Sequence, residues 1–111
     1  MHKLSSLGTI AYELDDASGE LRGVVIGYTN NLPEDRGSYI TQVVVDRKYQ
    51  RQGVCSRLLK EYIQFCRTKG IAYVWLTTGI HNLPAQKTYE KAGFVRVPYD
   101  SSENVKYMLM L

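Results

Sequence analysis

The hydrophobic pattern changes its period in the middle of the chain. The run "SYITQVVVD", residues 38–46, is rich in β-branched residues, which predicts a strand buried on both faces. Between Val54 and Cys66 the apolar residues recur every three or four positions, as on one face of a helix, and Gly70 suits the helix end. The run "IAYVWLTT", residues 71–78, is again continuous and apolar. Strand, crossover helix and strand predict a parallel pair with a right-handed connection, the second strand lying inside the sheet.

Shorter elements flank this unit. The acidic turn "DDASGE" joins two β-rich runs, which predicts a hairpin that continues as three antiparallel strands. The remaining elements are strands at 8–14, 21–29, 94–99 and 105–111, and a short helix from Asn82 to Gly93. The predicted order is β-β-β-α-β-α-β-β, in one α/β (α+β) domain that spans residues 1–111.

Composition excludes several classes of protein. With 111 residues and a formal charge of +3, the chain is neither a long repeat nor a strongly basic nucleic-acid binder. Its apolar runs fall short of the roughly 20 residues of a membrane helix, so we expect a cytoplasmic protein that binds neither membrane nor nucleic acid. Cys55 and Cys66 would lie about 16 Å apart on one helix, too far for a disulfide. The histidines, His2 and His81, offer no zinc-binding spacing, and we expect no metal.

The turn "YQRQGVCS" lies between the strand at 38–46 and the helix. The unpaired amides of a first helical turn, together with the helix dipole, form an anion site. Positive charge would come from Arg47, Lys48, Arg51 and Arg57. Spacing alone is equally typical of a solvated basic turn that caps a helix.

Two motifs give the turn a more specific interpretation. Gln50, Gly53 and Cys55 fit the pattern Gln/Arg-x-x-Gly-x-Gly/Ala. A second pattern, Asn-x-x-Ala-x-x-x-Tyr-x-x-x-Gly-Phe, is met in full by Asn82, Ala85, Tyr89, Gly93 and Phe94. With these motifs the sequence resembles the GNAT superfamily of N-acetyltransferases from about Gly8 to its end. In that family the first motif holds the pyrophosphate of acetyl-CoA.

The resemblance implies acetyl-CoA as cosubstrate and a binding mode for it. In the family two parallel strands separate, and the pantetheine arm enters between them as if it were another strand. The backbone of Val43 to Val45 would bind that arm and polarise the thioester carbonyl. The implied coenzyme-binding residues are Val43, Val44, Val45, Gln50, Arg51, Gln52, Gly53, Val54, Cys55, Ser56, Asn82 and Tyr89.

The resemblance also makes Tyr89 the candidate general acid for the leaving coenzyme A thiolate. As a residue type alone, Tyr89 could equally be a core tyrosine. The general base is open, because many members carry a glutamate near the position of Thr41, and threonine cannot act as a base. The candidates are Glu13, His81 or a chain of waters.

Cys55 has two interpretations. A helix N-terminus lowers the pKa of a thiol, which would make Cys55 reactive, whereas a bound diphosphate would oppose the thiolate. Because the motif requires a small residue at this position, the alternative is a cysteine that is merely tolerated there.

The chain also departs from the family before its first strand. The family usually begins with a strand and two helices, but only seven residues precede Gly8, so we expect an open acceptor site and a homodimer. Asp100 and Glu103 in the last turn would favour a cationic amine, unless they are merely solvated. The predicted function is transfer of acetyl to a primary amine by direct attack. The alternative is a regulatory module that binds coenzyme A without catalysis.

Overall fold

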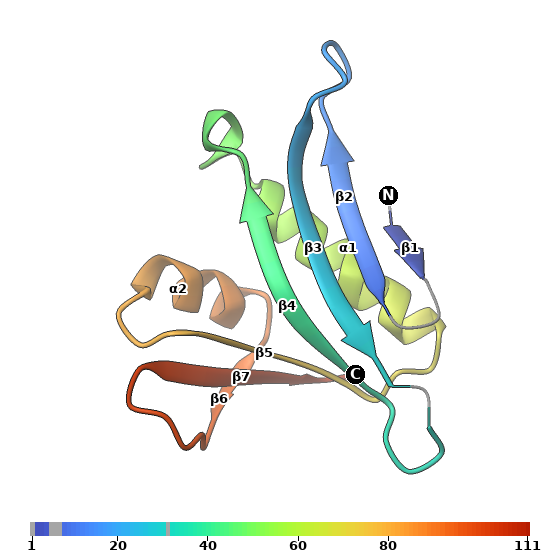
Figure 1. Cartoon of the computed structure of the whole chain (residues 1–111), viewed down its shortest axis with the longest axis vertical. Helices are drawn as coiled ribbons and strands as arrows, with labels where there is room; N and C mark the ends of the chain where they lie inside the picture. The colour runs from blue at the N-terminus through green and yellow to red at the C-terminus, as the bar shows by residue number, and fades with distance from the viewer. Residues whose placement is uncertain (1, 5–7, 31) are drawn as a thin grey trace.

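The strand and helix boundaries follow the sequence periodicity closely. A computed structural model describes residues 2–4, 8–30 and 32–111 of the chain (Figure 1). The elements are β1 (His2–Leu4), β2 (Thr9–Leu14), β3 (Leu21–Thr29), β4 (Gly37–Val45), the 3-10 helix η1 (Arg47–Tyr49), α1 (Val54–Thr68), β5 (Tyr73–Gly79), α2 (Leu83–Lys91), β6 (Val95–Val97) and β7 (Asn104–Met110). The predicted order is confirmed from β2 onward.

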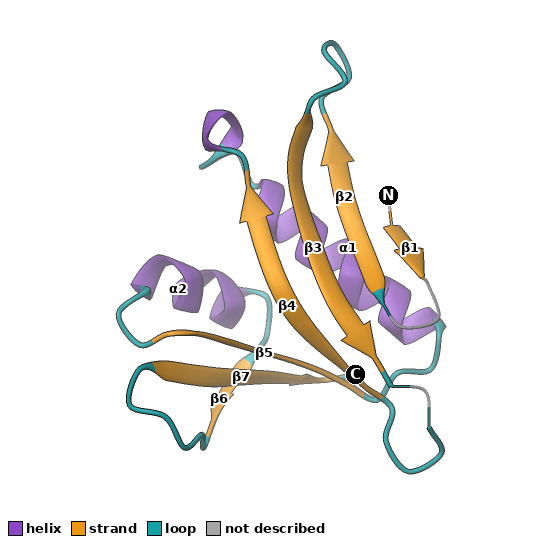
Figure 2. Ribbon diagram, in the orientation of Figure 1, coloured by secondary structure: helices purple, strands orange, loops and turns teal. Residues whose placement is uncertain are grey.

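The seven strands that the described residues form make one mixed sheet, in the order β1-β2-β3-β4-β5-β7-β6 (Figure 2). As predicted, β2, β3 and β4 are antiparallel, while β4 and β5 are parallel. The strand β5 lies inside the sheet, between β4 and β7. The strand β1, which pairs with β2 at the sheet edge, was not predicted from the sequence. The combined length and hydropathy of a membrane-spanning helix is reached by no helix of the described residues.

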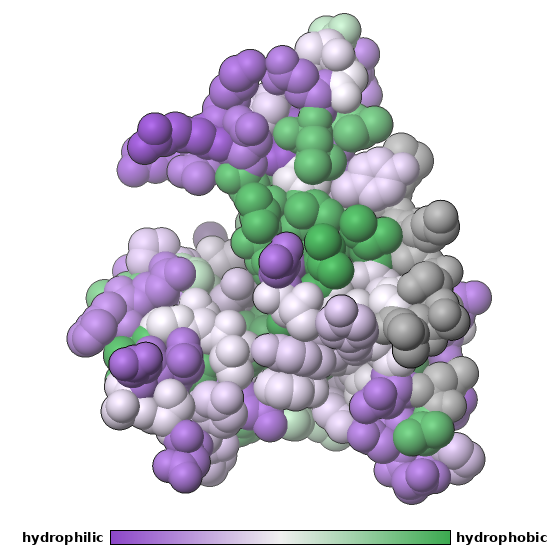
Figure 3. Space-filling view, in the orientation of Figure 1, coloured by the Kyte–Doolittle hydropathy of each residue, from purple (hydrophilic) through white to green (hydrophobic). Residues whose placement is uncertain are grey.

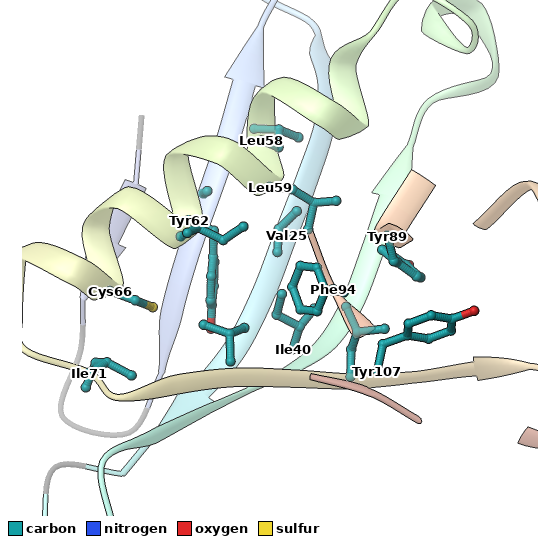
Figure 4. Close-up of a cluster of buried hydrophobic side chains, with 14 of the residues drawn as sticks. Val25, Ile40, Leu58, Leu59, Tyr62, Cys66, Ile71, Tyr89, Phe94 and Tyr107 are labelled. Atoms are coloured by element: carbon teal, nitrogen blue, oxygen red, sulfur yellow. The ribbon is translucent and has the colours of Figure 1, made fainter. Parts of the chain in front are cut away.

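Helix α1 packs on one face of the sheet and forms most of the core with it (Figures 1 and 4). Its buried side chains, among them Leu59 and Tyr62, meet residues such as Val25. Glycines at φ 73° and φ 100°, Gly70 and Gly93, follow the two helices, as their sequence positions predict.

A chain of hydroxyl groups crosses this core. Tyr62 Oη lies 2.7 Å from Ser38 Oγ, which lies 3.0 Å from Thr29 Oγ1, and Thr29 Oγ1 lies 2.9 Å from Thr9 Oγ1. Gly27 leaves room for the Tyr62 hydroxyl, since a Cβ there would collide with it. The buried hydroxyls therefore satisfy one another.

The prediction that residues 38–46 are buried on both faces is wrong. Ser38 and Ile40 are buried beneath α1, but Thr41, Gln42 and Val44 are exposed. The reason is tertiary, because the described part of the chain places no helix over the opposite face of β2, β3 and β4 (Figure 1).

Candidate functional site

Strands β4 and β5 diverge after a short paired segment. Their parallel pairing is confined to three positions, from Gly37 opposite Tyr73 to Tyr39 opposite Trp75. Beyond Trp75, β5 pairs with β7 alone, and Figure 1 shows β4 and β5 running apart. Thr41 lies at a β-bulge, where the β3–β4 register shifts, and bulges bend a strand. Among the residues that the structure describes, no strand therefore pairs with the second half of β4 on the β5 side.

Along the second half of β4, the backbone N–H and C=O groups of successive residues point alternately toward β3 and away from it. Asp46 N–H donates to the Arg22 carbonyl of the strand β3 at 2.8 Å, so Val44, two residues earlier, also directs its backbone groups toward β3. Val43 and Val45 direct theirs away from β3, and Gln50 Nε2 donates to the Val45 carbonyl at 3.4 Å. The prediction that Val44 offers its backbone to a ligand is therefore wrong, whereas Val43 and Val45 remain suitable.

The first turn of α1 points its amides into an open pocket. Gly53, at φ 76°, precedes the helix and provides no side-chain cap. Within the described residues, the N–H groups of Val54, Cys55 and Ser56 have no acceptor. A pocket of about 340 Å³ brings these residues together, and it is lined by Val45, Tyr49, Gln50, Arg51, Gly53, Val54, Cys55, Ser56 and Thr88. This geometry fits an anionic group such as a diphosphate.

Only part of the predicted positive charge is free. Lys48 Nζ pairs with Glu20 at 3.0 Å, and Arg57 Nη2 pairs with Glu13 at 2.8 Å. Arg47 and Arg51 are exposed and form no ion pair in the parts of the chain that the structure describes. Arg47 and Arg51, rather than all four basic residues, are thus the cations available to an anion.

Tyr89 extends from α2 into the core and is 7% exposed. Its ring lies 6.1 Å from that of Phe94 and 6.2 Å from that of Tyr107, measured between centroids (Figure 4). Burial raises the pKa of Tyr89 to about 12, and the charge of a Cys55 thiolate would act in the same direction. The Tyr89 hydroxyl is not fully enclosed and forms no hydrogen bond within the described residues. It is therefore a protonated and uncommitted donor close to the α1 turn.

The connection between β5 and α2 is held by two polar side chains. Asn82 Oδ1 accepts from Ala85 N–H at 3.4 Å, so Asn82 caps α2. Gln86, which the sequence analysis missed, is 8% exposed and donates to the carbonyls of Gly79 and Ile80, both at 3.0 Å. The sequence does contain an indication of this role, because Gln86 is a polar residue one turn after Asn82, on the buried side of a short helix.

The surroundings of Cys55 favour the interpretation that this cysteine is merely tolerated at a position that requires a small residue. Burial raises the pKa of the Cys55 thiol, which disfavours the alternative of an activated thiolate at this helix terminus. Cys55 and Cys66 are both free thiols.

The structure places the candidate general bases in different environments. Glu13 is wrong as a base, because the Arg57 and Arg22 guanidinium groups lower its pKa to about 2 and leave it a very weak proton acceptor. Thr41 is exposed and donates its hydroxyl to the Ile26 carbonyl at 3.1 Å. His81 is exposed in the turn before α2 and stays an untested candidate, as do bridging waters.

The fold and the site together define a mixed α/β protein in which two parallel strands diverge beside an uncapped helix N-terminus. The profile of the Acetyltransferase (GNAT) family matches residues 3–94, so the chain belongs to the GNAT family. Members of this family use acetyl-CoA.

Individual relatives agree with this assignment. The chain is 32% identical over 76 residues to human N-acetyltransferase 8, covering 63% of the chain and 34% of the relative. It is 41% identical over 61 residues to human N-alpha-acetyltransferase 30, covering 55% and 17%. The chain thus spans about a third or less of these relatives. The NatC complex bound to Gag peptide and CoA shares the fold, with a TM-score of 0.78 and 20% identity over 94% of this chain and 70% of that one.

Proposed function

We propose that the protein transfers an acetyl group from acetyl-CoA to a primary amine by direct attack, without a covalent enzyme intermediate. The observation that carries the proposal is the divergence of β4 from β5 beside the uncapped start of α1. The space beside the second half of β4 suits an extended pantetheine arm. The adjacent N-terminus of α1 suits the diphosphate of coenzyme A.

Each part of the site has a separate task. Val43 and Val45 would hydrogen-bond the arm through backbone groups that β3 does not use, as an added strand does. The amides of Val54 to Ser56, with Arg51, would hold the diphosphate. When bound, acetyl-CoA supplies a thioester whose carbonyl carbon the amine attacks.

Tyr89 would protonate the departing sulfur. With a pKa of about 12, Tyr89 stays protonated throughout the neutral range. A thiol has a reference pKa near 8.5, so proton transfer from such a phenol to a free thiolate is unfavourable. Tyr89 would therefore donate its proton as the C–S bond breaks rather than after it.

The experiment follows coenzyme A release with a thiol reagent over a panel of amines. The panel compares the α-amine of peptides, the lysine side chain and a polyamine, because several relatives are named N-alpha-acetyltransferases. Release that depends on both acetyl-CoA and amine supports the proposal, and mass spectrometry of the product identifies the acetylated nitrogen. Absence of release with every amine contradicts it.

A second candidate is a coenzyme-A-binding module without catalysis. It is favoured by one observation, which is that Thr41 and the doubly paired Glu13 leave β2 and β4 without a usable base. Tight coenzyme A binding in calorimetry, with no turnover in the same panel, would select it.

We also propose that a second copy of the chain covers the open face of β2 to β4. Leu14, Tyr28 and Val44 are 39%, 57% and 52% exposed, and Figure 3 shows a hydrophobic area over these strands. Sedimentation at micromolar concentration should show a dimer that Val44→Lys dissociates. Val95→Lys, at an exposed valine on β6, is the control and should leave the dimer intact. A monomeric wild type contradicts this proposal.

A further inference from the structure

One guanidinium group connects three separate parts of the candidate site. Arg57, in the first turns of α1, donates from Nε and Nη2 to the two carboxylate oxygens of Glu13 on β2, at 2.9 and 2.8 Å. Its remaining nitrogen, Nη1, donates to the main-chain carbonyl of Gln52 at 2.9 Å. The loop before α1 is thereby fastened to a strand 44 residues earlier through a bidentate contact.

The two sides of this contact differ in exposure. The Glu13 side chain is 21% exposed and also pairs with Arg22 at 3.2 Å, whereas the Arg57 side chain is 50% exposed. The Lys48–Glu20 pair is 67% and 49% exposed on its two sides, and such surface pairs contribute little. The bidentate Glu13–Arg57 pair is therefore the better shielded of these two ion pairs between the β2–β3 hairpin and the segment that leads into α1.

The Gln52 carbonyl, which accepts the hydrogen bond from Arg57, lies at the turn that leads into α1. It lies directly before Gly53, whose left-handed conformation turns the chain into α1 without a capping side chain. The direction of the Val54 to Ser56 amides depends on this turn. A shift of the Gln52–Gly53 peptide would therefore turn those amides away from a bound anion.

We propose that Glu13 is a positioning residue that, through Arg57, holds the Gln52–Gly53 turn so that the first amides of α1 face the coenzyme diphosphate. This inference rests on the proposed coenzyme A site and adds a residue from outside both sequence motifs. Glu13 does not touch the ligand, and it carries the same charge sign as the diphosphate.

The sign of the effect separates this role from simple electrostatics. If Glu13 acted only through its charge, Glu13→Gln would free Arg57 and tighten the binding of anionic coenzyme A. If Glu13 positions the turn, the same isosteric change weakens binding by about tenfold, because a charged hydrogen-bond pair is lost. The value of kcat at saturating acetyl-CoA should change less than twofold, so the effect falls on KM.

The control is Asp16→Asn, which removes one negative charge from the same hairpin. Within the described chain, the exposed Asp16 side chain forms no ion pair or hydrogen bond. Arg57→Lys keeps the charge but cannot make all three contacts, and it should weaken binding as Glu13→Gln does. Because both variants break one connection, the double variant should bind no more weakly than either single variant.

Coenzyme A affinity is measured by calorimetry, and hydrogen exchange is measured at the Arg57 amide, which donates to the Gly53 carbonyl at 3.0 Å. Weaker binding and faster exchange in Glu13→Gln, with neither in Asp16→Asn, support the inference. Unchanged or tighter binding in Glu13→Gln overturns it. A wild type that binds no coenzyme A refutes the proposed function instead. In that case, hydrogen exchange at the Arg57 amide still tests whether Glu13 positions the turn. Equal exchange rates in Glu13→Gln and Asp16→Asn overturn this positioning role.

Discussion

Removal of the Tyr89 hydroxyl should abolish most catalysis while leaving the fold intact. Tyr89→Phe keeps the ring between Phe94 and Tyr107, at centroid distances of 6.1 and 6.2 Å. Because the hydroxyl forms no hydrogen bond within the described residues, its loss should change the free energy of unfolding by no more than about 0.5 kcal/mol. Loss of a general acid typically lowers kcat by about 10² to 10⁴.

Tyr107→Phe is the matched control. Tyr107 is a fully buried neighbour whose hydroxyl donates to Glu90 Oε2 at 2.7 Å. Its removal should cost about 1 kcal/mol of stability, or about 4 °C in Tm, while kcat stays near the wild-type value. The two phenylalanine variants should therefore show opposite patterns of stability and activity.

The assay measures coenzyme A release at saturating acetyl-CoA and amine, with Tm and coenzyme A affinity measured on the same samples. For the wild type, Tyr89 should cause no loss of kcat as pH rises to about 10, because its pKa of about 12 keeps it protonated. Retention of kcat within about threefold in Tyr89→Phe, with normal coenzyme binding, would refute the role of Tyr89 as acid.

Three further predictions concern the core and the α1 turn. Gly27→Ala should destabilise the protein by about 2 kcal/mol through collision with the Tyr62 hydroxyl, whereas Gly79→Ala, with only one neighbour at 3.9 Å, should cost far less in denaturant unfolding. Equal costs would contradict this reasoning. Burial raises the pKa of Tyr62 and of Tyr89 to about 12, above the unfolded value near 10. The free energy of unfolding should therefore fall between pH 10 and 12, because the unfolded chain loses these protons first. Tyr62→Phe should reduce that fall. An identical alkaline titration in Tyr62→Phe would count against it. Cys55→Ala should retain acetyl transfer and coenzyme affinity, since the thiol is not activated, and a large loss of kcat alone would restore the nucleophile interpretation.

The local structure of this chain was predictable from its sequence. The change of hydrophobic period placed β4, α1 and β5 within two residues of their observed ends, because helix and strand periodicities are set by near neighbours. The glycines after the two helices were predictable for the same reason. Both motifs, around Gly53 and Tyr89, lie on the elements that were predicted for them.

The two motifs and the hydrophobic periodicity were enough to indicate the family, the order of elements from β2 onward and the position of the turn before α1. Which residues are available at that turn follows only from contacts between elements that are distant in the sequence. The alternation of side chains along a strand does not reveal which neighbouring strand each backbone group faces. The bulge at Thr41 sets this register, so that Val43 and Val45 direct their backbone groups away from β3 and Val44 directs its own toward β3. Likewise, Glu13 and Arg57 are 44 residues apart, and their pairing exists only because α1 crosses back over β2. That crossing removes Glu13 as a base and ties it to the turn before Gly53.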